Sequence, residues 1–489
     1  MLTLFAKNSV RHADRPAFRD AGQLVTWQEA ERRIRQVLAL WQRAGERSGQ
    51  RVALFLEQNV DSVLILLAAL GKGDQIALLD PRMSASEWER TEQALQPEQV
   101  LGSAAVLNRL SVTAPGRSVA DTLAEAQNEE PSAEEAEGRG SLLFLTSGST
   151  GQPKFVERFV PALRAEGRSY VQTLDLTERD VFYAGLPLFH SYAFGCALLA
   201  ALECGGCLVI PPMFYPPKVV QWIRRYDVTF LPLVPSLVRL LVDSLDEQVA
   251  LPSLRYAMVG TGQTTPELAA KFQEKLGLSL SGNYGSSETG GLVSRLESME
   301  QARGATGRAM SGVNLLIADE AGQPVPTGVT GQVLVETAGL FSGYLGMPAP
   351  TASAVGGWWK MGDLGYLDEE GRLHVTGRIS NVLQRNGKKI SAEYLESALL
   401  RHEEILEAAV VGVRSGEAQD DRIYAVVVQA SGATLDAPAV RMHCFETAGR
   451  HASPDEVIFV EELPRSANGK LLRGELLAAV RSLSGGALS

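Results

Sequence analysis

The segment from Thr146 to Lys154, TSGSTGQPK, follows an apolar run and combines hydroxyl groups, glycines and one lysine. Small residues let the main chain approach an anion closely, and backbone N–H groups with a cation can hold phosphate oxygens. The spacing is not that of a Walker loop, because Gln152 and Pro153 separate Gly151 from the lysine and Pro153 disfavours an early helical turn. The loop therefore predicts a nucleotide-phosphate site. A surface turn rich in serine and glycine remains the alternative for this loop taken alone.

A second glycine-containing segment, VGTGQ at 259–263, was compared with the dinucleotide-binding fingerprint. It supplies a Gly-x-Gly but lacks the third glycine that the fingerprint requires. The sequence thus indicates a nucleotide-phosphate site that is neither a Walker loop nor a dinucleotide-binding fingerprint.

The elements around the loop alternate between strands and helices. Before it, strands at 51–57 and 75–80 alternate with helices, two of which begin with capping boxes at Thr26/Glu29 and Ser84/Glu87. After it we expect a helix over 155–167, and then strands at 181–187, 207–211, 229–234 and 254–259 alternating with helices at 193–202, 219–226, 236–245 and 266–276. This alternation predicts parallel sheets covered on both faces.

The remaining segments differ in texture. Residues 115–140 are acidic and rich in Pro, Gly and Ser, which favours a solvated connector. Residues 305–377 contain short strands punctuated by Gly and Pro, which predicts an antiparallel sheet or barrel. We therefore expect an α/β protein with a large N-terminal domain (1–379) of two covered βα sheets and a small β-barrel-like region, followed by a small mobile α+β C-terminal domain (380–489).

Composition excludes several classes of function. The net charge of -11 and the pI near 5.3 argue against a dedicated binder of nucleic acid or anionic membranes. The longest apolar run, Val63 to Leu70, is too short to span a membrane, and the amino terminus lacks the order of a signal peptide, so we expect a cytoplasmic location. Cys204 and Cys207 have redox or zinc spacing without a second pair, which favours two small buried residues at a turn over redox chemistry.

Six further motifs follow the loop in a fixed order: LPLFHSYAFG (186–195), VGTGQ (259–263), NYGSSETGG (283–291), WWKMGDLGYLDEEGRLHVTGR (358–378), RNGKKIS (385–391) and LPRSANGK (463–470). In this order and spacing, over nearly the whole chain, the sequence resembles the adenylate-forming ligases, which include acyl- and aryl-CoA synthetases, adenylation domains and luciferase-like enzymes. The resemblance implies that a carboxylate attacks ATP, pyrophosphate leaves, and the acyl-adenylate passes its acyl group to a nucleophile, usually a thiol. Two anions must meet in this reaction, so fixed donors, a cation and a metal are required.

The resemblance also implies roles for the nucleotide-binding residues. The loop would wrap the β- and γ-phosphates with Thr146, Ser147, Gly148, Ser149, Thr150, Gly151 and Lys154. Tyr284 would offer a face to adenine, Ser287 a hydroxyl to the α-phosphate and Glu288 an oxygen ligand to Mg²⁺. Gly260 and Gly262 would let the backbone pass beside the purine and the acyl chain.

By the same resemblance, the carboxy-terminal motifs supply the ribose contact and the moving parts. Asp363, with Arg378 beside it, would bind the ribose hydroxyls, and Lys470 would bridge the acid carboxylate and the α-phosphate. Ser380 occupies the hinge position, and Gly387 would line the pantetheine channel in the second half-reaction.

The acid is expected to bind near His190, which together with Phe189 corresponds to the family's carboxylate pocket. We expect the pocket to include Tyr192, Phe194, Gly260, Gly285, Gly290 and Gly291, with the glycines at 285, 290 and 291 leaving space for the substrate. Amino-acid-activating relatives usually carry an aspartate in the neighbourhood of His190, and its absence argues against an α-amino acid.

Four residues depart from the family pattern: Phe155 for glycine, Met361 for threonine, Ser380 for Asp or Lys, and Gln384 for lysine. We expect Phe155 to reshape the mouth of the pocket and Ser380 to alter the rotation of the small domain.

The leading hypothesis is an ATP- and Mg²⁺-dependent ligase that joins a carboxylic acid, aliphatic or aromatic, to CoA, with Lys470, His190 and Glu288 in the catalytic roles. One alternative keeps the first step and transfers the acyl group to the phosphopantetheine of a separate acyl carrier protein. A third hypothesis is a non-catalytic nucleotide-binding relative.

Overall fold

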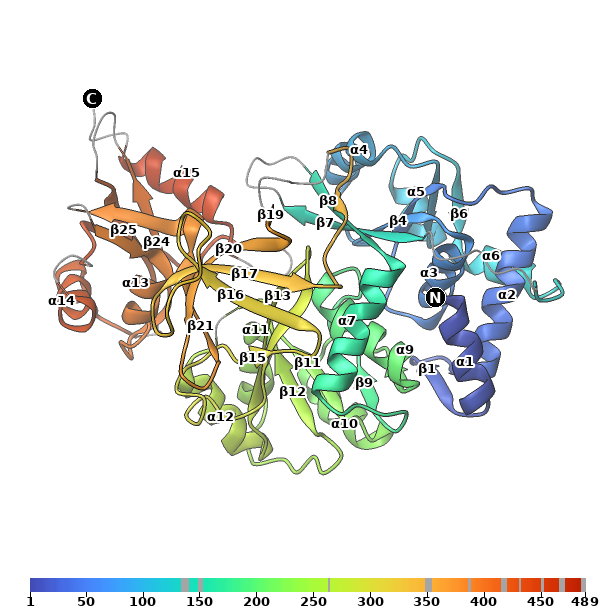
Figure 1. Ribbon diagram of the computed structural model, residues 1–489, viewed down its shortest axis with the longest axis horizontal. Helices are drawn as coiled ribbons and strands as arrows, with labels where there is room; N and C mark the ends of the chain where they lie inside the picture. The colour runs from blue at the N-terminus through green and yellow to red at the C-terminus, as the bar shows by residue number, and fades with distance from the viewer. Residues whose placement is uncertain are drawn as a thin grey trace. The chain divides into compact units, whose positions relative to one another are not determined.

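The computed structural model describes residues 1–132, 140–147, 153–262, 264–347, 354–385, 388–414, 420–430, 432–449, 453–465 and 471–484. The chain divides into two compact units (Figure 1). Unit 1 consists of Met1–Asn314 and Glu336–Gly357, and unit 2 consists of Leu315–Val335 and Trp358–Ser489.

Within the described residues, the largest sheet of unit 1 has nine strands in the order β15-β14-β13-β12-β11-β9-β10-β1-β2. Its strands β9 to β13 are parallel, whereas β14 and β15 at one end and β2 at the other are antiparallel to their neighbours. Their bounds are β1 Pro16–Arg19, β2 Leu24–Thr26, β9 Val181–Tyr183, β10 Cys207–Val209, β11 Phe230–Leu233, β12 Tyr256–Val259, β13 Leu280–Ser286, β14 Gly290–Arg295 and β15 Arg308–Ala309.

A second sheet of unit 1 has the described strand order β18-β8-β7-β4-β3-β5-β6. The strands from β7 to β6 run parallel, and β8 returns antiparallel beside β7. Their bounds are β3 Arg51–Phe55, β4 Gln75–Leu79, β5 Gln99–Gly102, β6 Gly116–Ser118, β7 Ser141–Ser147, β8 Pro153–Phe159 and β18 Gly343–Tyr344.

Helices cover these sheets, as the alternating pattern predicts. One face of the larger sheet packs on α10, α11 and α12 through a core that includes Ile223, Leu241 and Phe272, and Figure 1 shows α10 and α12 beside β11 and β12. The segment η1 contacts β9, β11 and β14. The helical bounds are α1 Leu2–His12, α2 Trp27–Arg43, α3 Val60–Lys72, α4 Ala85–Leu95, α5 Ala104–Arg109, α6 Val119–Ala126, α7 Val160–Thr173, α8 Ser191–Ala193, η1 (π-helical) Phe194–Leu199, α9 Ala200–Cys204, α10 Pro216–Tyr226, α11 Pro235–Asp243 and α12 Pro266–Leu276.

Unit 2 begins with antiparallel strands and ends with an α+β layer structure. In its first part β17 pairs with β20, and β20 pairs with β21. A separate pair is formed by β22 and β23, and β24, β25 and β26 form a further sheet. The bounds are β16 Val313–Ala318, β17 Gly331–Thr337, β20 Trp358–Leu367, β21 Leu373–Arg378, η3 (3-10) Ile379–Asn381, β22 Val382–Arg385, β23 Lys388–Ser391, α13 Ala392–Leu399, β24 Ile405–Val413, β25 Arg422–Gln429, α14 Ala437–Ala448, β26 Glu456–Phe459 and α15 Arg473–Ser484. The short strand β19, Ala354–Val355, belongs to unit 1.

The sheet around β24 and β25 is apolar on both faces because consecutive residues of these strands point to opposite sides. Val410 and Ala425 pack with α13 and α14, whereas the neighbouring Val411 and Val426 pack with α15. Figure 1 shows α15 on one side of this sheet and α13 on the other. The domain boundary predicted between residues 379 and 380 stays a prediction. The second segment of unit 2 begins earlier, at Trp358.

Two predicted segments differ from the structure. Residues 155–167 do not form one helix, because β8 pairs with β7 through Phe159 and α7 begins only at Val160. Pro161 lies in the first turn of α7, where its missing N–H and fixed φ are tolerated, whereas it would have disrupted the interior of the predicted helix. The predicted connector at 115–140 also contains β6 and α6, and α6 is capped by the Ser118 hydroxyl.

The two predicted helix starts differ in detail. At Ser84 the capping box is complete, since its hydroxyl accepts from Glu87 N–H and the Glu87 carboxylate accepts from Ser84 N–H at 2.8 Å. At Thr26 the hydroxyl accepts from Glu29 N–H, but the Glu29 carboxylate binds Arg32 and Arg33, each at 2.7 Å. These arginines hold the pKa of Glu29 below its usual value.

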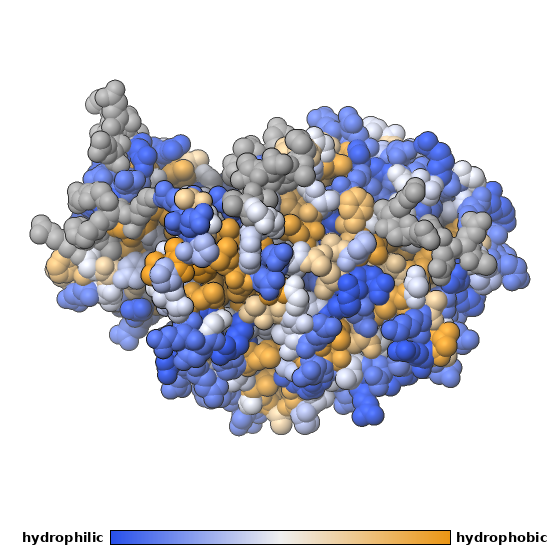
Figure 2. Space-filling model, in the orientation of Figure 1, coloured by the Kyte–Doolittle hydropathy of each residue, from blue (hydrophilic) through white to orange (hydrophobic). Residues whose placement is uncertain are grey.

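The surface is mixed in polarity. Figure 2 shows hydrophilic and hydrophobic residues interspersed over the face that it draws. Across the described residues, the structure contains no helix with the length and apolar character needed to cross a membrane.

Candidate functional site

The predicted phosphate loop connects the antiparallel strands β7 and β8. Thr146 pairs with Lys154 and Ser147 with Pro153, and the Thr146 hydroxyl donates to the Lys154 carbonyl at 3.2 Å. The strand ladder thus brings the first hydroxyl of the motif directly opposite its lysine. The predicted ligands Gly148, Ser149, Thr150 and Gly151 lie outside the described residues.

Phe155, the residue that was expected to reshape the pocket mouth, has another position. Its side chain is buried and packs in the core under α4 with Phe55 and Trp88. Adjacent residues of a strand point to opposite sides, so Phe155 faces this core while Lys154 faces the other side. The expectation that Phe155 reshapes a pocket mouth is therefore wrong, because its ring is part of the hydrophobic core.

The segment NYGSSETGG forms the hairpin of β13 and β14, with Ser287, Glu288 and Thr289 at its tip. The Thr289 hydroxyl accepts from Ser286 N–H at 3.2 Å and closes the turn. The half-buried Glu288 carboxylate accepts from the Tyr344 hydroxyl at 2.9 Å, and its backbone carbonyl accepts from Phe341 N–H at 2.7 Å. Burial and the neighbouring carboxylate raise the pKa of Tyr344, which keeps its hydroxyl a donor toward Glu288.

The tip of this hairpin contacts the motif LPLFHSYAFG. The hydroxyls of Ser287 and Ser191 are 3.0 Å apart. His190 is the residue before α8, and its ring lies edge-on to that of Phe189 with centroids 4.4 Å apart. The structure therefore brings His190 and Glu288, which are far apart in the sequence, to neighbouring positions through the Ser191–Ser287 contact.

The motif VGTGQ reaches the same region through Tyr192. Its hydroxyl donates to the Met258 carbonyl at 2.7 Å, and burial holds its pKa well above the usual range. Gly260, which directly follows β12, lies under the Tyr192 ring, so that a Cβ there would stand 2.7 Å from the ring carbon Cζ. Thr261 adopts a positive φ of 65°, and the following Gly262 is exposed.

These motifs meet because of the sheet topology. The segments that contain His190, Gly260 and Glu288 follow β9, β12 and β13, which point the same way in the parallel part of the sheet. Carboxyl ends of parallel strands lie along one edge, where open α/β sheets usually bind ligands. The candidate site of unit 1 is this edge.

The glycines of the hairpin do not leave the open space that was expected. A Cβ on Gly285 would lie 2.0 Å from the Gly290 carbonyl oxygen, one on Gly290 would lie 2.3 Å from Glu166 Cδ, and one on Gly291 would lie 2.2 Å from Tyr170 Oη. Protein atoms already fill the side on which a side chain would stand, so this expectation is wrong there. The glycines allow close backbone packing.

In unit 2, Asp363 and Arg378 form a direct pair. They lie opposite each other on β20 and β21, and Arg378 Nε is 3.1 Å from Asp363 Oδ1. Asp363 is buried whereas Arg378 is exposed. Gly362 precedes it with a φ of 77°, a conformation that glycine adopts without strain.

The remaining predicted residues of unit 2 are partly described. Ser380 is exposed in η3, and its hydroxyl donates to the Asn381 side chain at 3.1 Å. Gln384 lies on β22 opposite Lys389. Gly387 and Lys470 lie outside the described residues, and an isolated bridge between Arg465 and Leu471 flanks the SANGK segment.

Sequence reasoning missed several residues that support the hairpin tip and its base. They are Arg158, Glu166, Tyr170, Ser191 and Tyr344. Glu166 had a detectable signal, because it lies among Leu163, Gly167 and Tyr170 on the apolar stripe of its helix. A charged residue on such a stripe predicts a buried partner.

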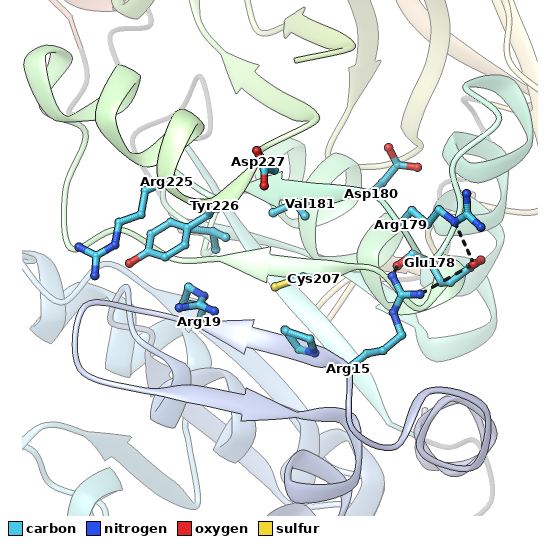
Figure 3. Close-up of a pocket in the computed structure, with 12 residues that line it drawn as sticks. Arg15, Arg19, Glu178, Arg179, Asp180, Val181, Cys207, Arg225, Tyr226 and Asp227 are labelled. Carbon is cyan, nitrogen blue, oxygen red and sulfur yellow. Dashed lines mark hydrogen bonds and ion pairs between the residues drawn. The ribbon is translucent and has the colours of Figure 1, made fainter. Parts of the chain in front are cut away.

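The pocket in Figure 3 lies elsewhere on unit 1, by the amino ends of β9 and β10, and has a volume of about 270 Å³. Figure 3 shows Tyr226 beside Arg19 and Arg225 at one end, and Glu178 near Arg15 and Arg179 at the other. None of the residues predicted for the site lines it.

Cys207 also lines this pocket, and it is a free thiol, as is Cys204. Burial raises the pKa of each thiol to about 12. The nucleophilic thiolate form is therefore suppressed near neutral pH, which favours the structural role over redox chemistry.

Comparison with known proteins agrees with the motif order. Residues 5–345 match the model of the AMP-binding enzyme family, and residues 394–470 match the AMP-binding enzyme C-terminal domain. The sulfoacetate-CoA ligase of Cupriavidus necator is 30% identical over 455 residues, covering 89% of this chain and 88% of that protein. The 2-succinylbenzoate-CoA ligase of Geobacillus kaustophilus is 29% identical, covering 95% and 94%.

The fold is matched by solved structures as well. ATP-bound MatB from Rhodopseudomonas palustris superimposes with a TM-score of 0.86 at 25% identity over 99% of both chains. The matched family models, the relatives and the shared fold lead to one conclusion: this chain belongs to the AMP-binding enzyme family, the adenylate-forming superfamily.

Proposed function

We propose that this protein is an acid-CoA ligase that activates a carboxylic acid with ATP and passes the acyl group to the thiol of CoA. In the first step a carboxylate oxygen bonds to the α-phosphorus and the bond from that phosphorus to the bridging oxygen breaks, releasing pyrophosphate. In the second step the CoA sulfur bonds to the acyl carbon and AMP leaves. The relatives named above are CoA ligases, which supports ATP and CoA as substrates.

The observation that carries this function is the meeting of three motifs at one sheet edge. The Ser191–Ser287 contact of 3.0 Å and the packing of Tyr192 on Gly260 join the segments that contain His190, Gly260 and Glu288. A carboxylate pocket and an ATP phosphate site must adjoin for the first step, because the attacking oxygen has to reach the α-phosphate in line. We therefore assign the acid to the side of Phe189, His190 and Tyr192.

Roles toward the nucleotide are proposed for the two hairpins of unit 1 and, separately, for Asp363 of unit 2. Thr146, Ser147 and Lys154, with the rest of their loop, would hold the β- and γ-phosphates. Tyr284 would face adenine and Ser287 the α-phosphate. Asp363 is suited to the ribose, since a carboxylate can accept from both hydroxyls, and Arg378 Nε lies 3.1 Å from Asp363 Oδ1.

Glu288 fits a magnesium ligand. Mg²⁺ is usually held by one or two carboxylates together with substrate phosphates and water, and Glu288 offers a half-buried carboxylate at the tip of a turn. The described residues contain no cluster of three or more His, Cys, Asp or Glu side chains that could hold a metal by themselves, so the ATP phosphates would complete the coordination. Bound there, the ion would neutralise charge that builds up on the phosphates.

We assign the acid to the aliphatic and aromatic carboxylic acids that carry no α-amino group. The segment from Phe189 to Tyr192 contains no aspartate to pair with a substrate ammonium. The cytoplasmic location expected from the sequence stays a prediction.

The proposed function is tested by pyrophosphate exchange into ATP across a panel of aliphatic and aromatic acids, followed by thioester formation with and without CoA. We expect acid-dependent exchange with at least one acid, and thioester formation with free CoA. Turnover with the phosphopantetheine of a carrier protein, but not with free CoA, would establish the alternative acceptor. A complete lack of exchange across the panel would favour the non-catalytic hypothesis and contradict the proposal.

A further inference from the structure

A buried ion pair lies behind the candidate site. Arg158 on β8 and Glu166 on α7 are joined by Arg158 Nη1 and Glu166 Oε2 at 2.6 Å, and their side chains are 0% and 1% exposed. Withdrawing two charges from water is costly, and a buried ion pair is often no more stabilising than apolar residues of similar size. The stability of the fold therefore gives little reason for this pair.

The second oxygen of Glu166 contacts the backbone of the hairpin that contains Glu288. Glu166 Oε1 accepts from Gly291 N–H at 3.0 Å. Gly290 packs against the same carboxylate, and a Cβ on Gly290 would clash with it because it would lie 2.3 Å from Glu166 Cδ. Gly195 of η1 is equally close, because a Cβ there would lie 2.0 Å from Oε1. The carboxylate thus fills the space between β14 and η1.

Arg158 connects the Glu166 carboxylate to the β7–β8 hairpin, which contains Lys154. It lies on β8 four positions after Lys154, and its Nε donates to the Gly339 carbonyl at 3.1 Å. The chain from Gly339 continues to Phe341 and Tyr344, which contact Glu288. A second polar contact supports the same hairpin, since the Tyr170 hydroxyl is 3.1 Å from Asn283 Oδ1.

We propose that Glu166 is a positioning residue for the reaction: it fixes the β13–β14 hairpin, and hence Ser287 and Glu288, while Arg158 holds the Glu166 carboxylate and couples it to the strand that contains Lys154. This inference rests on the proposed function for its catalytic consequence. Its structural half, the immobilisation of the hairpin through Gly291, stands on the contacts alone. A purely stabilising role is the competing explanation.

Two variants separate the explanations because they change the charge and the hydrogen bond differently. Arg158→Met/Glu166→Leu replaces both charges by apolar groups of similar size, which is often tolerated, but it removes the acceptor for Gly291 N–H. Glu166→Gln keeps a carbonyl oxygen able to accept from Gly291 N–H and leaves Arg158 buried without its charged partner. Positioning predicts that Glu166→Gln supports adenylation better than the double variant does. A purely stabilising role predicts the reverse order, with activity following the melting temperature.

The experiment uses the full chain and two readouts. Hydrogen exchange followed by mass spectrometry measures the peptide spanning residues 284–295, and pyrophosphate exchange measures kcat for adenylation. In the double variant we expect exchange in this peptide to accelerate selectively, and kcat to fall about 10- to 100-fold, the size of effect seen when an outer support of a ligand is lost. Glu203→Gln is the matched control. Glu203 lies on α9 and pairs at 2.7 Å with Arg164, which lies on α7 as Glu166 does. This control variant should change kcat less than about twofold.

Several outcomes would overturn the inference. One is a folded double variant with wild-type exchange in residues 284–295 and wild-type kcat. If the double variant does not fold, Glu166→Leu is compared with Glu166→Gln, because both leave Arg158 without its charged partner and only the glutamine keeps an acceptor for Gly291 N–H. Faster exchange of residues 284–295 in Glu166→Leu than in Glu166→Gln supports positioning, whereas equal exchange of this peptide in the two variants refutes it. If wild-type protein lacks acid-dependent pyrophosphate exchange, the proposed function fails. Comparing the hydrogen exchange of residues 284–295 among the variants still tests whether Glu166 immobilises the hairpin.

Discussion

The two hairpins that contain the expected nucleotide ligands differ in the contacts of their described residues. Among the described residues, the β7–β8 hairpin is fixed along its strands: Thr146 pairs with Lys154, and Glu157 near the base accepts from Gln75 and Ser141 at 2.6 and 2.8 Å. The β13–β14 hairpin is also paired along its strands, and its tip, which the structure describes, has further contacts of Ser287 with Ser191 and of Glu288 with Tyr344.

The two tasks proposed for the hairpins place different demands on geometry. A lysine acts on phosphate as a flexible point charge and tolerates small changes in position. A carboxylate that binds Mg²⁺ must meet nearly ideal octahedral geometry, so it gains from side chains that fix it. We infer that catalysis depends more steeply on the geometry of the second hairpin than on that of the first.

The largest effect is expected from Glu288→Gln. It removes the anionic ligand at the tip of the second hairpin and should lower the rate of adenylation about 100- to 1,000-fold, because a group that stabilises charge in the transition state is lost. The measurement is pyrophosphate exchange over a magnesium titration. Near wild-type activity at any magnesium concentration would contradict the role of Glu288. Glu297→Gln on the same chain segment, beyond β14, serves as the charge-matched control.

A similar loss limited to one half-reaction is expected from Lys470→Ala. The charge that bridges two oxyanions is needed for adenylation but not for transfer to CoA, so adenylation should fall about 100-fold while transfer from supplied acyl-adenylate stays near wild type. Rapid-mixing measurements of the two half-reactions test this. Equal loss in both half-reactions would refute the assignment of Lys470.

On the first hairpin, Lys154→Ala should cost less than Glu288→Gln. Losing a hydrogen bond to a charged group corresponds to about 1.5–3 kcal/mol, or roughly 10- to 100-fold in kcat/KM for ATP. The loss should appear chiefly in KM, since the lysine contacts phosphates in the ground state as well as in the transition state. A larger loss than that of Glu288→Gln, confined to kcat, would reverse the comparison between the hairpins.

The sequence predicted the alternation of strands and helices, and its motifs indicated the candidate site residues, because both signals depend on residues close together in the chain. It failed at 155–167, where pairing with β7 outweighs the local pattern and Pro161 belongs to a helix start rather than to a helix interior. The apolar surroundings of Phe155 could not be foreseen either, since they come from β3, β4 and α4.

The supports of the site were harder to predict than its ligands. Glu288 belongs to a motif, but its partner Tyr344 lies 56 residues away, and Gly291 N–H meets a carboxylate 125 residues away. Only the fold brings such groups together. The glycines illustrate the same limit, because their small size is explained by Glu166 and Tyr170 behind them, which no local pattern indicates.

A smaller effect is expected from Tyr344→Phe, which removes the hydroxyl that donates to Glu288 and keeps the ring. Loss of such a support typically costs about 10-fold in activity or metal affinity, so adenylation should need more magnesium to reach its maximum. Tyr215→Phe, at an exposed tyrosine of unit 1, is the control. An unchanged magnesium requirement would show that the carboxylate is placed without Tyr344.

The smallest effect should follow Ser191→Ala. The Ser191–Ser287 hydroxyl pair is neutral and half-buried, so its net worth is about 0.5–1.5 kcal/mol, or roughly 2- to 10-fold in the rate of adenylation. Because both hydroxyls belong to one contact, Ser191→Ala and Ser287→Ala should be non-additive in a double-mutant cycle. Ser244→Ala, which removes a hydroxyl bonded within its own segment at 2.8 Å, provides the matched control. Strict additivity would mean that Ser287 acts on the nucleotide independently of Ser191, and the fixation of the hairpin tip would then depend on its other contacts, such as that of Glu288 with Tyr344.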